Sequence, residues 1–159
     1  MERFRRQPNE TTLLKAPITY LRGEQTFKAI MFQGASMDCK AFLTSQRFVA
    51  VQKSSWMDNL GALFILVAWL VPKKIIFEIP LENLASVRYG EAKVNHELIL
   101  KTMEGTEFKI RLTGLADTFG GDTRKVWIKT LSDAAKETCP EIEVKGDETT
   151  TEFIRPQRD

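Results

Sequence analysis

The feature that most constrains the fold of this chain is a period-two pattern of side chains between Glu97 and Leu112. One set of alternate positions holds Leu98, Leu100 and Thr102 before a Gly-containing turn at residues 103–106, and Phe108, Ile110 and Leu112 after it. Successive side chains of a strand point to opposite faces, so a period of two gathers one set on one face. The stretch therefore predicts a β-hairpin with one face in water.

The period changes after Gly120 and Gly121. Apolar residues then recur with helical spacing, at Trp127, Ile128, Leu131, Ala134 and Ala135. Asp122 or Thr123 is a suitable N-cap, and Pro140 ends the segment, so we expect one amphipathic helix running to about Thr138.

Five shorter stretches upstream are rich in β-forming residues and bounded by loop residues. They cover residues 26–32, 40–43, 48–53, 74–79 and 86–89, and Pro80 and Gly90 end the last two. Strands followed by one amphipathic helix predict a mainly β (α+β) fold, in which the helix closes the apolar interior of an antiparallel sheet.

With 159 residues the chain has the length of one domain. Residues 1–14 are polar and basic with an early Pro8, which predicts a flexible N-terminal arm. The domain itself is expected to span residues 15–140 and to carry an apolar insert at residues 56–72. Residues 141–159 are interpreted as a polar C-terminal tail.

The charge and cysteine content exclude several classes of protein. The net charge of +2 is too small for the strong field that drives non-specific nucleic-acid binding, so no nucleic-acid partner is expected. The two cysteines, Cys39 and Cys139, lie far apart and match neither a disulfide framework nor a zinc site. The charged N-terminus lacks the apolar core of a signal peptide. We therefore expect a cytoplasmic protein, free or peripheral on a membrane.

Four short motifs, in order, resemble the pleckstrin-homology-like (PH-like) superfamily, and within it the GRAM-type and bacterial pleckstrin-homology domains. They are Gly23-Glu24, the Phe-Leu-Thr-Ser-Gln-Arg-Phe segment within residues 41–49, Ile-Pro-Leu-Glu-Asn-Leu-Ala-Ser-Val at residues 79–87, and the hairpin turn at residues 103–108. The resemblance covers about residues 20–138. It implies a strongly bent antiparallel sheet or barrel of about seven strands, capped by the C-terminal helix.

The same resemblance implies recognition of a lipid, a peptide or a protein and not catalysis. Candidate anion contacts are Lys28, Lys40, Arg47 and Lys53. The phosphoinositide-binding members of the superfamily place several basic residues in and after the loop that follows the first strand. Here residues 33–39 contain none, which argues against inositol-phosphate specificity.

The insert contains an uncharged apolar run, Leu60–Val71. Its 12 residues would make a helix of about 18 Å, whereas the hydrocarbon core of a bilayer is about 30 Å thick, so the run is too short to span a membrane. Leaving it in water would forgo about 20 kcal/mol of burial free energy, more than a domain of this size has in reserve. Something must cover this run.

Three covers remain open: the domain's own core, a second copy of the chain, or the interface of a membrane. The domain's own core is the simplest of the three, while interfacial aromatic residues and a following lysine pair support the membrane. The predicted contact residues are Trp56, Leu60, Leu63, Phe64, Leu66, Trp69, Leu70, Lys73 and Lys74.

Catalytic signals are weak throughout. His96 is the single histidine, and neither cysteine has a partner nearby in sequence. The carboxylates do not follow calcium-loop spacing, so neither a metal nor a cofactor is expected. The sequence therefore predicts a non-catalytic binding module that is lipid-facing through its insert. The alternative is a soluble module that uses the insert for protein interaction or homo-oligomerisation.

Overall fold

The computed structural model describes residues 4–5, 7–22, 36–52, 74–91 and 95–156. Within them, nine strands form one antiparallel sheet in the order β4-β3-β2-β1-β7-β6-β5-β9-β8. The strands are β1 (Thr12–Leu21), β2 (Ser36–Thr44), β3 (Arg47–Gln52), β4 (Ile75–Pro80), β5 (Leu84–Tyr89), β6 (Glu97–Thr102), β7 (Glu107–Leu112), β8 (Glu143–Gly146) and β9 (Thr150–Ile154). The helical elements are the 3₁₀ turn η3 (Leu81–Asn83), the single turn α3 (Leu115–Thr118) and the long helix α4 (Arg124–Thr138).

The predicted hairpin and the predicted helix are both confirmed. Strands β6 and β7 pair with Leu98 opposite Ile110 and Leu100 opposite Phe108. Leu98, Leu100 and Ile110 have no exposed surface, while Lys101 on the opposite face is exposed. Helix α4 ends at Thr138, as its spacing and Pro140 predict.

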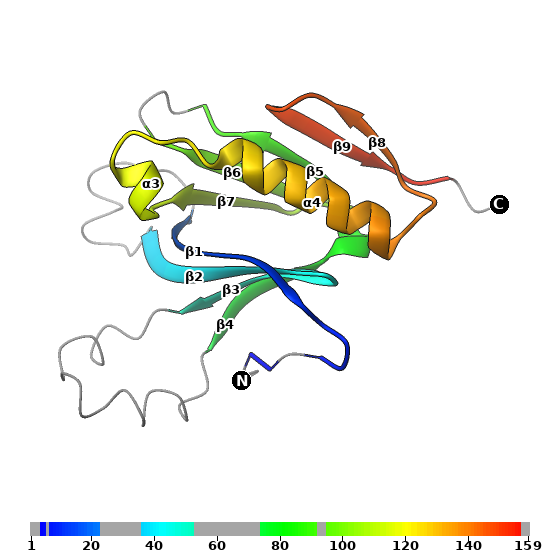
Figure 1. Cartoon of the computed structure of the whole chain (residues 1–159), viewed down its shortest axis with the longest axis horizontal. Coiled ribbons are helices and arrows are strands. Elements are labelled where there is room, and N and C mark those ends of the chain that lie inside the picture. The colour runs from blue at the N-terminus through cyan, green and yellow to red at the C-terminus, as the bar shows by residue number, and fades with distance from the viewer. Residues whose placement is uncertain (1–3, 6, 23–35, 53–73, 92–94, 157–159) are drawn as a thin grey trace.

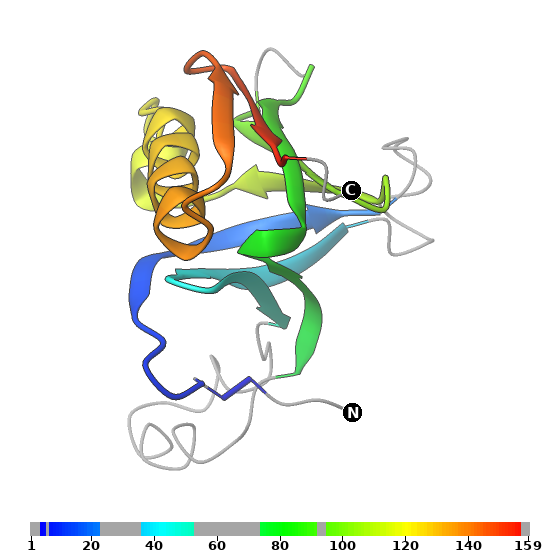
Figure 2. The same cartoon turned by 90° about the vertical axis from the view of Figure 1, so that its right-hand side faces the viewer.

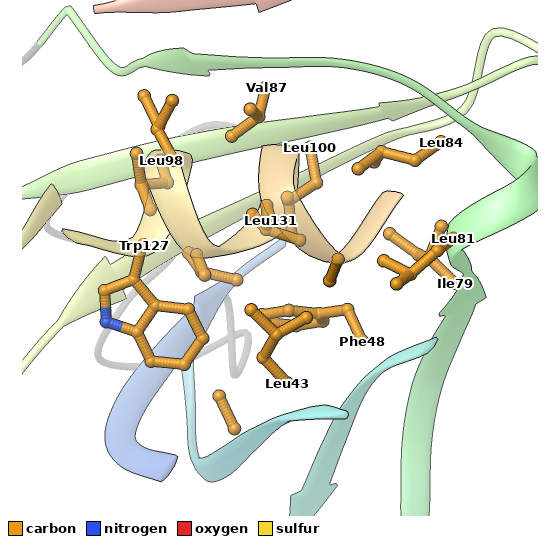
Figure 3. Close-up of a cluster of buried hydrophobic side chains, with 14 of the residues drawn as sticks. Leu43, Phe48, Ile79, Leu81, Leu84, Val87, Leu98, Leu100, Trp127 and Leu131 are labelled. Carbon is orange, nitrogen blue, oxygen red and sulfur yellow. The ribbon is translucent and has the colours of Figure 1, made fainter. Parts of the chain in front are cut away.

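The sheet bends so that its two halves face one core, and α4 lies across them (Figures 1 and 2). The core contains apolar residues from β1 to β7, η3, α4 and β9. Figure 3 shows Trp127 and Leu131 of α4 reaching down between Leu43 and Phe48 on one side and Leu98 and Leu100 on the other. The Trp127 and Phe48 rings pack edge to face, with 5.9 Å between their centroids.

The structure adds a strand near the N-terminus that the sequence analysis missed. The first strand was expected at residues 26–32, which lie outside the described residues, whereas the first observed strand is β1. Pro17 obscures its pattern, but Pro17 is tolerated because the ladder between β1 and β7 begins only at Ile18. Residues 12–14, assigned to the flexible arm, belong to this strand.

The C-terminal segment also differs from the expected polar tail. Strands β8 and β9 form a hairpin, and β9 pairs with β5, so the sheet has nine strands where about seven were expected. Phe153, Thr151 and the preceding Ile142 are buried and anchor the hairpin. The threonines and glutamates between these few apolar residues hid the alternation in the sequence.

We expect Trp127→Ala to lower the free energy of unfolding by about 3 to 5 kcal/mol, because the indole is 97% buried and its removal leaves a cavity in the core. Val126→Ala, next to it on the exposed side of α4, should change the value by less than about 0.5 kcal/mol. Urea denaturation measures both. Equal midpoints for the two variants would contradict the role given to α4.

Candidate functional site

The predicted insert joins β3 to β4 at one end of the sheet. At this point the Gln52 N–H donates to the Lys74 carbonyl oxygen at 2.9 Å, and Val51 pairs with Ile75. We call Gln52 and Lys74 the neck of the insert. Lys74 is exposed there. The other predicted contact residues lie outside the described residues: Trp56, Leu60, Leu63, Phe64, Leu66, Trp69, Leu70 and Lys73.

A second, smaller apolar cluster lies on the outer face of the sheet and extends to the neck. Phe42, Val49 and Val51 form it, with Ile75 and Phe4 packed against them. The Phe4 and Phe42 rings stack, with 4.9 Å between their centroids. The N-terminal segment is therefore attached to the sheet at this point, and does not match the free arm that its composition suggests.

The same segment is held by a buried ion pair. Arg47 Nε donates to Glu10 Oε1 at 2.9 Å, and Arg47 Nη1 donates to Glu78 Oε2 at 2.7 Å. Thr44 donates its hydroxyl hydrogen to the other side of the Glu10 Oε1 atom at 2.7 Å. The Glu10 side chain has no exposed surface, so this network joins the N-terminal segment to the β2–β3 turn.

Arg47 is thereby removed from the set of candidate anion contacts, because Glu10 and Glu78 already neutralise its guanidinium group. Lys40 lies half-buried on β2, opposite Val51. Lys28 and Lys53 are outside the described residues. Of these four basic residues, the described part of the chain therefore contains Lys40 and Arg47.

The Glu10 carboxyl has a pKa below its ordinary value of 4.5. Burial opposes its ionisation, but hydrogen bonds from Arg47, from the Gln7 N–H and from Thr44 outweigh that effect. Since the pKa is lower in the folded state, the stabilisation is present above pH 4.5 and is lost as the pH falls through the folded-state value.

We expect Glu10→Gln to lower the free energy of unfolding at neutral pH by about 2 to 4 kcal/mol, because Arg47 loses a buried partner. The difference from wild type should narrow on acidification below pH 4.5. Glu148→Gln, which removes an exposed partner of Lys125, should cost less than about 1 kcal/mol. Denaturation curves across this pH range test the network, and a difference independent of pH would be evidence against it.

The connection from β7 to α4 contains a feature that the sequence analysis did not identify. The α3 turn exposes Leu115 and Phe119, which are four residues apart, while Asp117 points inward with its side chain 4% exposed. Asp117 accepts hydrogen bonds from the Thr123 N–H at 3.2 Å and the Thr123 hydroxyl at 3.0 Å, and its Oδ1 lies 3.0 Å from His96 Nδ1. The turn is thus fixed to the start of α4.

Two glycines shape the end of this turn. Gly120 has a φ of +88°, in the left-handed region. The Gly121 N–H donates to the Ala116 carbonyl at 2.6 Å, and a Cβ at Gly121 would lie 2.7 Å from that oxygen. In the sequence, this turn could have been recognised from two large apolar residues, Leu115 and Phe119, that stand four residues apart between Gly114 and Gly120.

Donor atoms of His96, Asp117 and Asp122 come within 4.8 Å of one another, a spacing compatible with a metal ion. Asp122 accepts hydrogen bonds from Arg124 Nη2 at 2.7 Å and from the Arg124 N–H at 3.0 Å, and these lower its pKa. A cation at this point would meet the Arg124 guanidinium, and the other carboxylate already holds His96 and Thr123. These three residues therefore suit a hydrogen-bonded cluster that fixes the α3 turn to the start of α4 better than they suit a metal site. We call this cluster the clasp.

Asp117→Ala should loosen this clasp. We expect the free energy of unfolding to fall by about 1 to 3 kcal/mol, because Thr123 and His96 lose a shielded acceptor. Amide hydrogen exchange should accelerate at Thr123 and in α3. Asp133→Ala, on the exposed face of α4, should change neither quantity appreciably. Unchanged exchange in the Asp117 variant would show that the clasp does not hold the turn.

Two further features of the described residues are a buried thiol and a cleft beside α4. Burial raises the pKa of the Cys39 thiol to about 11, so it remains protonated at neutral pH and is a poor nucleophile. A cleft of about 440 Å³ between α4 and the β8–β9 hairpin is lined by charges of both signs, and Lys125 pairs with Glu148 there. Among the helices that the structure describes, none has the length and apolar character needed to cross a membrane.

No protein-family model and no curated protein matches the sequence. Solved structures do share its fold. The PH domain of human oxysterol-binding protein-related protein 11 is 8% identical, with 89% of this chain and 91% of that chain covered and a TM-score of 0.51. Vav1 with an allosteric inhibitor is 12% identical, covering 86% of this chain and 32% of that one, with a TM-score of 0.52.

A truncated linker-DH/PH fragment of p115-RhoGEF is 8% identical, covering 81% of this chain and 30% of that one, with a TM-score of 0.51. This chain therefore spans about a third of the two longer structures. Together with the bent sheet and the closing helix, these likenesses define a PH-like fold.

Proposed function

We propose that this PH-like domain is a non-catalytic module of the cytoplasm that docks peripherally on a membrane through the apolar segment between β3 and β4. The observation that carries the proposal is the uncharged run Leu60–Val71, which follows a neck at the end of the sheet. A GRAM-type relationship is consistent with this use of the fold and stays an expectation from the sequence motifs.

The make-up of the core supports a contact role for the run. The described apolar residues of the sheet and α4 already form one continuous buried cluster, so the segment is not needed to fill that interior. Twelve apolar residues that enter only the interface of a bilayer recover burial free energy without spanning it. Trp56, Trp69 and the Lys73–Lys74 pair suit the level of the headgroups.

The basic residues favour general attraction to anionic lipid over a specific headgroup site. Arg47 is neutralised by two glutamates, and residues 33–39 contain neither lysine nor arginine. Exposed Lys74 at the neck can still contribute about 1 kcal/mol of attraction near an anionic surface. We therefore expect binding to depend on apolar insertion and to respond to lipid charge without stereospecific recognition.

Charging the apolar run tests the proposal. We expect Phe64→Glu to remain folded and to lose binding to vesicles of phosphatidylcholine and phosphatidylserine, because the new charge stays hydrated in the free protein and is penalised only on insertion. Phe64→Leu, which keeps the site apolar, should bind nearly as well as wild type. Co-sedimentation measures binding, and circular dichroism verifies the fold.

Two other outcomes would contradict the proposal. If wild type ignores vesicles but self-associates, and Phe64→Glu blocks that association, the run is a protein contact and the oligomerisation alternative replaces the membrane. If wild type is monomeric and ignores vesicles while Phe64→Glu unfolds, the run belongs to the protein's own core.

A further inference from the structure

The α3 turn presents the two most exposed large apolar side chains of the described residues. Leu115 is 77% exposed and Phe119 is 81% exposed, whereas no other large hydrophobic residue in the described ranges exceeds 54%. Their spacing of four residues places both side chains on one side of the turn. They form a small protrusion, which we call the α3 tip.

The α3 tip has no exposed charge. Ala116, Thr118 and Gly120 are exposed beside the two large side chains, and the single carboxylate of the turn, on Asp117, is directed inward. Moving the tip out of water would therefore desolvate no ionised side chain of residues 115–120, and the exposed carboxylate of Asp122, two residues further on, is paired with Arg124. This composition suits an apolar environment.

The tip is also rigid. Asp117 is held by Thr123 and His96, and the close Gly121–Ala116 hydrogen bond closes the turn. A contact made by an already ordered turn loses little conformational entropy on binding. These hydrogen bonds thus keep Leu115 and Phe119 exposed to water, although their exposure costs free energy.

The tip lies at the same end of the molecule as the neck of the insert. In Figure 1 α3, the end of β3 and the start of β4 all lie at the left-hand end, while Figure 2 looks along that axis and separates α3 from β3 and β4 sideways. One broad, flat surface can therefore meet both places. A small partner seated on one of them would not reach the other.

We propose that the α3 tip is a second membrane contact, in which Leu115 and Phe119 enter the same lipid surface as the insert and set the orientation of the domain on it. The proposal rests on the proposed function. A stable protein interface needs about 800 Å² on each partner, far more than two side chains supply, whereas a lipid interface requires no matching shape. Two weak insertions carried by one chain reinforce each other through effective concentration.

The test uses the full chain and vesicles of phosphatidylcholine with phosphatidylserine. We expect the double variant Leu115→Ser, Phe119→Ser to bind about ten- to a hundredfold more weakly than wild type, as partial burial of two large side chains predicts. The matched control is Met103→Ser, which replaces a 54% exposed apolar residue. Its N–H bonds to Asn83 of η3, away from the α3 end, so its binding should be unchanged.

A second readout is independent of affinity. An environment-sensitive fluorophore on Phe119→Cys, in a Cys139→Ser background, should shift to the blue when vesicles are added, while the same label on Met103→Cys should not. Unchanged binding of the serine variant, with no shift at position 119 and Phe64→Glu still defective, overturns this inference and leaves the proposed function intact. Failure of wild type to bind vesicles overturns both.

Discussion

The burial of one face of α4 is the constraint on which the rest of this structure depends. A bent sheet with an apolar interior is unstable while that interior meets water, and Trp127, Ile128 and Leu131 close it. Because these side chains reach residues of both halves of the sheet, the helix also maintains the bend (Figure 3).

The same constraint explains the α3 tip. The chain must turn from the end of β7 to the start of α4 within a short connection, and Gly120 and Gly121 allow that turn. Asp117 secures it to Thr123, which leaves Leu115 and Phe119 facing outward. Exposed apolar residues held by a specific polar clasp are costly in water, and the proposed contact with lipid would offset that cost.

Features with a strong local period could be predicted from the sequence, and features formed by distant pairing could not. The hairpin of β6 and β7 and the helix α4 follow directly from apolar spacing. Strand β1 was missed because Pro17 obscures its sequence pattern, and the ion pair between Glu10 and Arg47 joins residues whose separation in the chain conceals their contact. The apolar run Leu60–Val71 was evident from composition alone, whereas the α3 tip became apparent only from its exposure.

Hydrogen–deuterium exchange of the whole chain, followed by mass spectrometry with and without vesicles, tests the central claim most directly. Membrane docking predicts slower exchange in peptides that cover residues 60–71 and 114–121, and unchanged exchange in the β8–β9 hairpin, where residues 143–154 are not part of the proposed contact. Exchange rates that vesicles leave unchanged in both residues 60–71 and residues 114–121 would contradict the account, as would slower exchange confined to the β8–β9 hairpin.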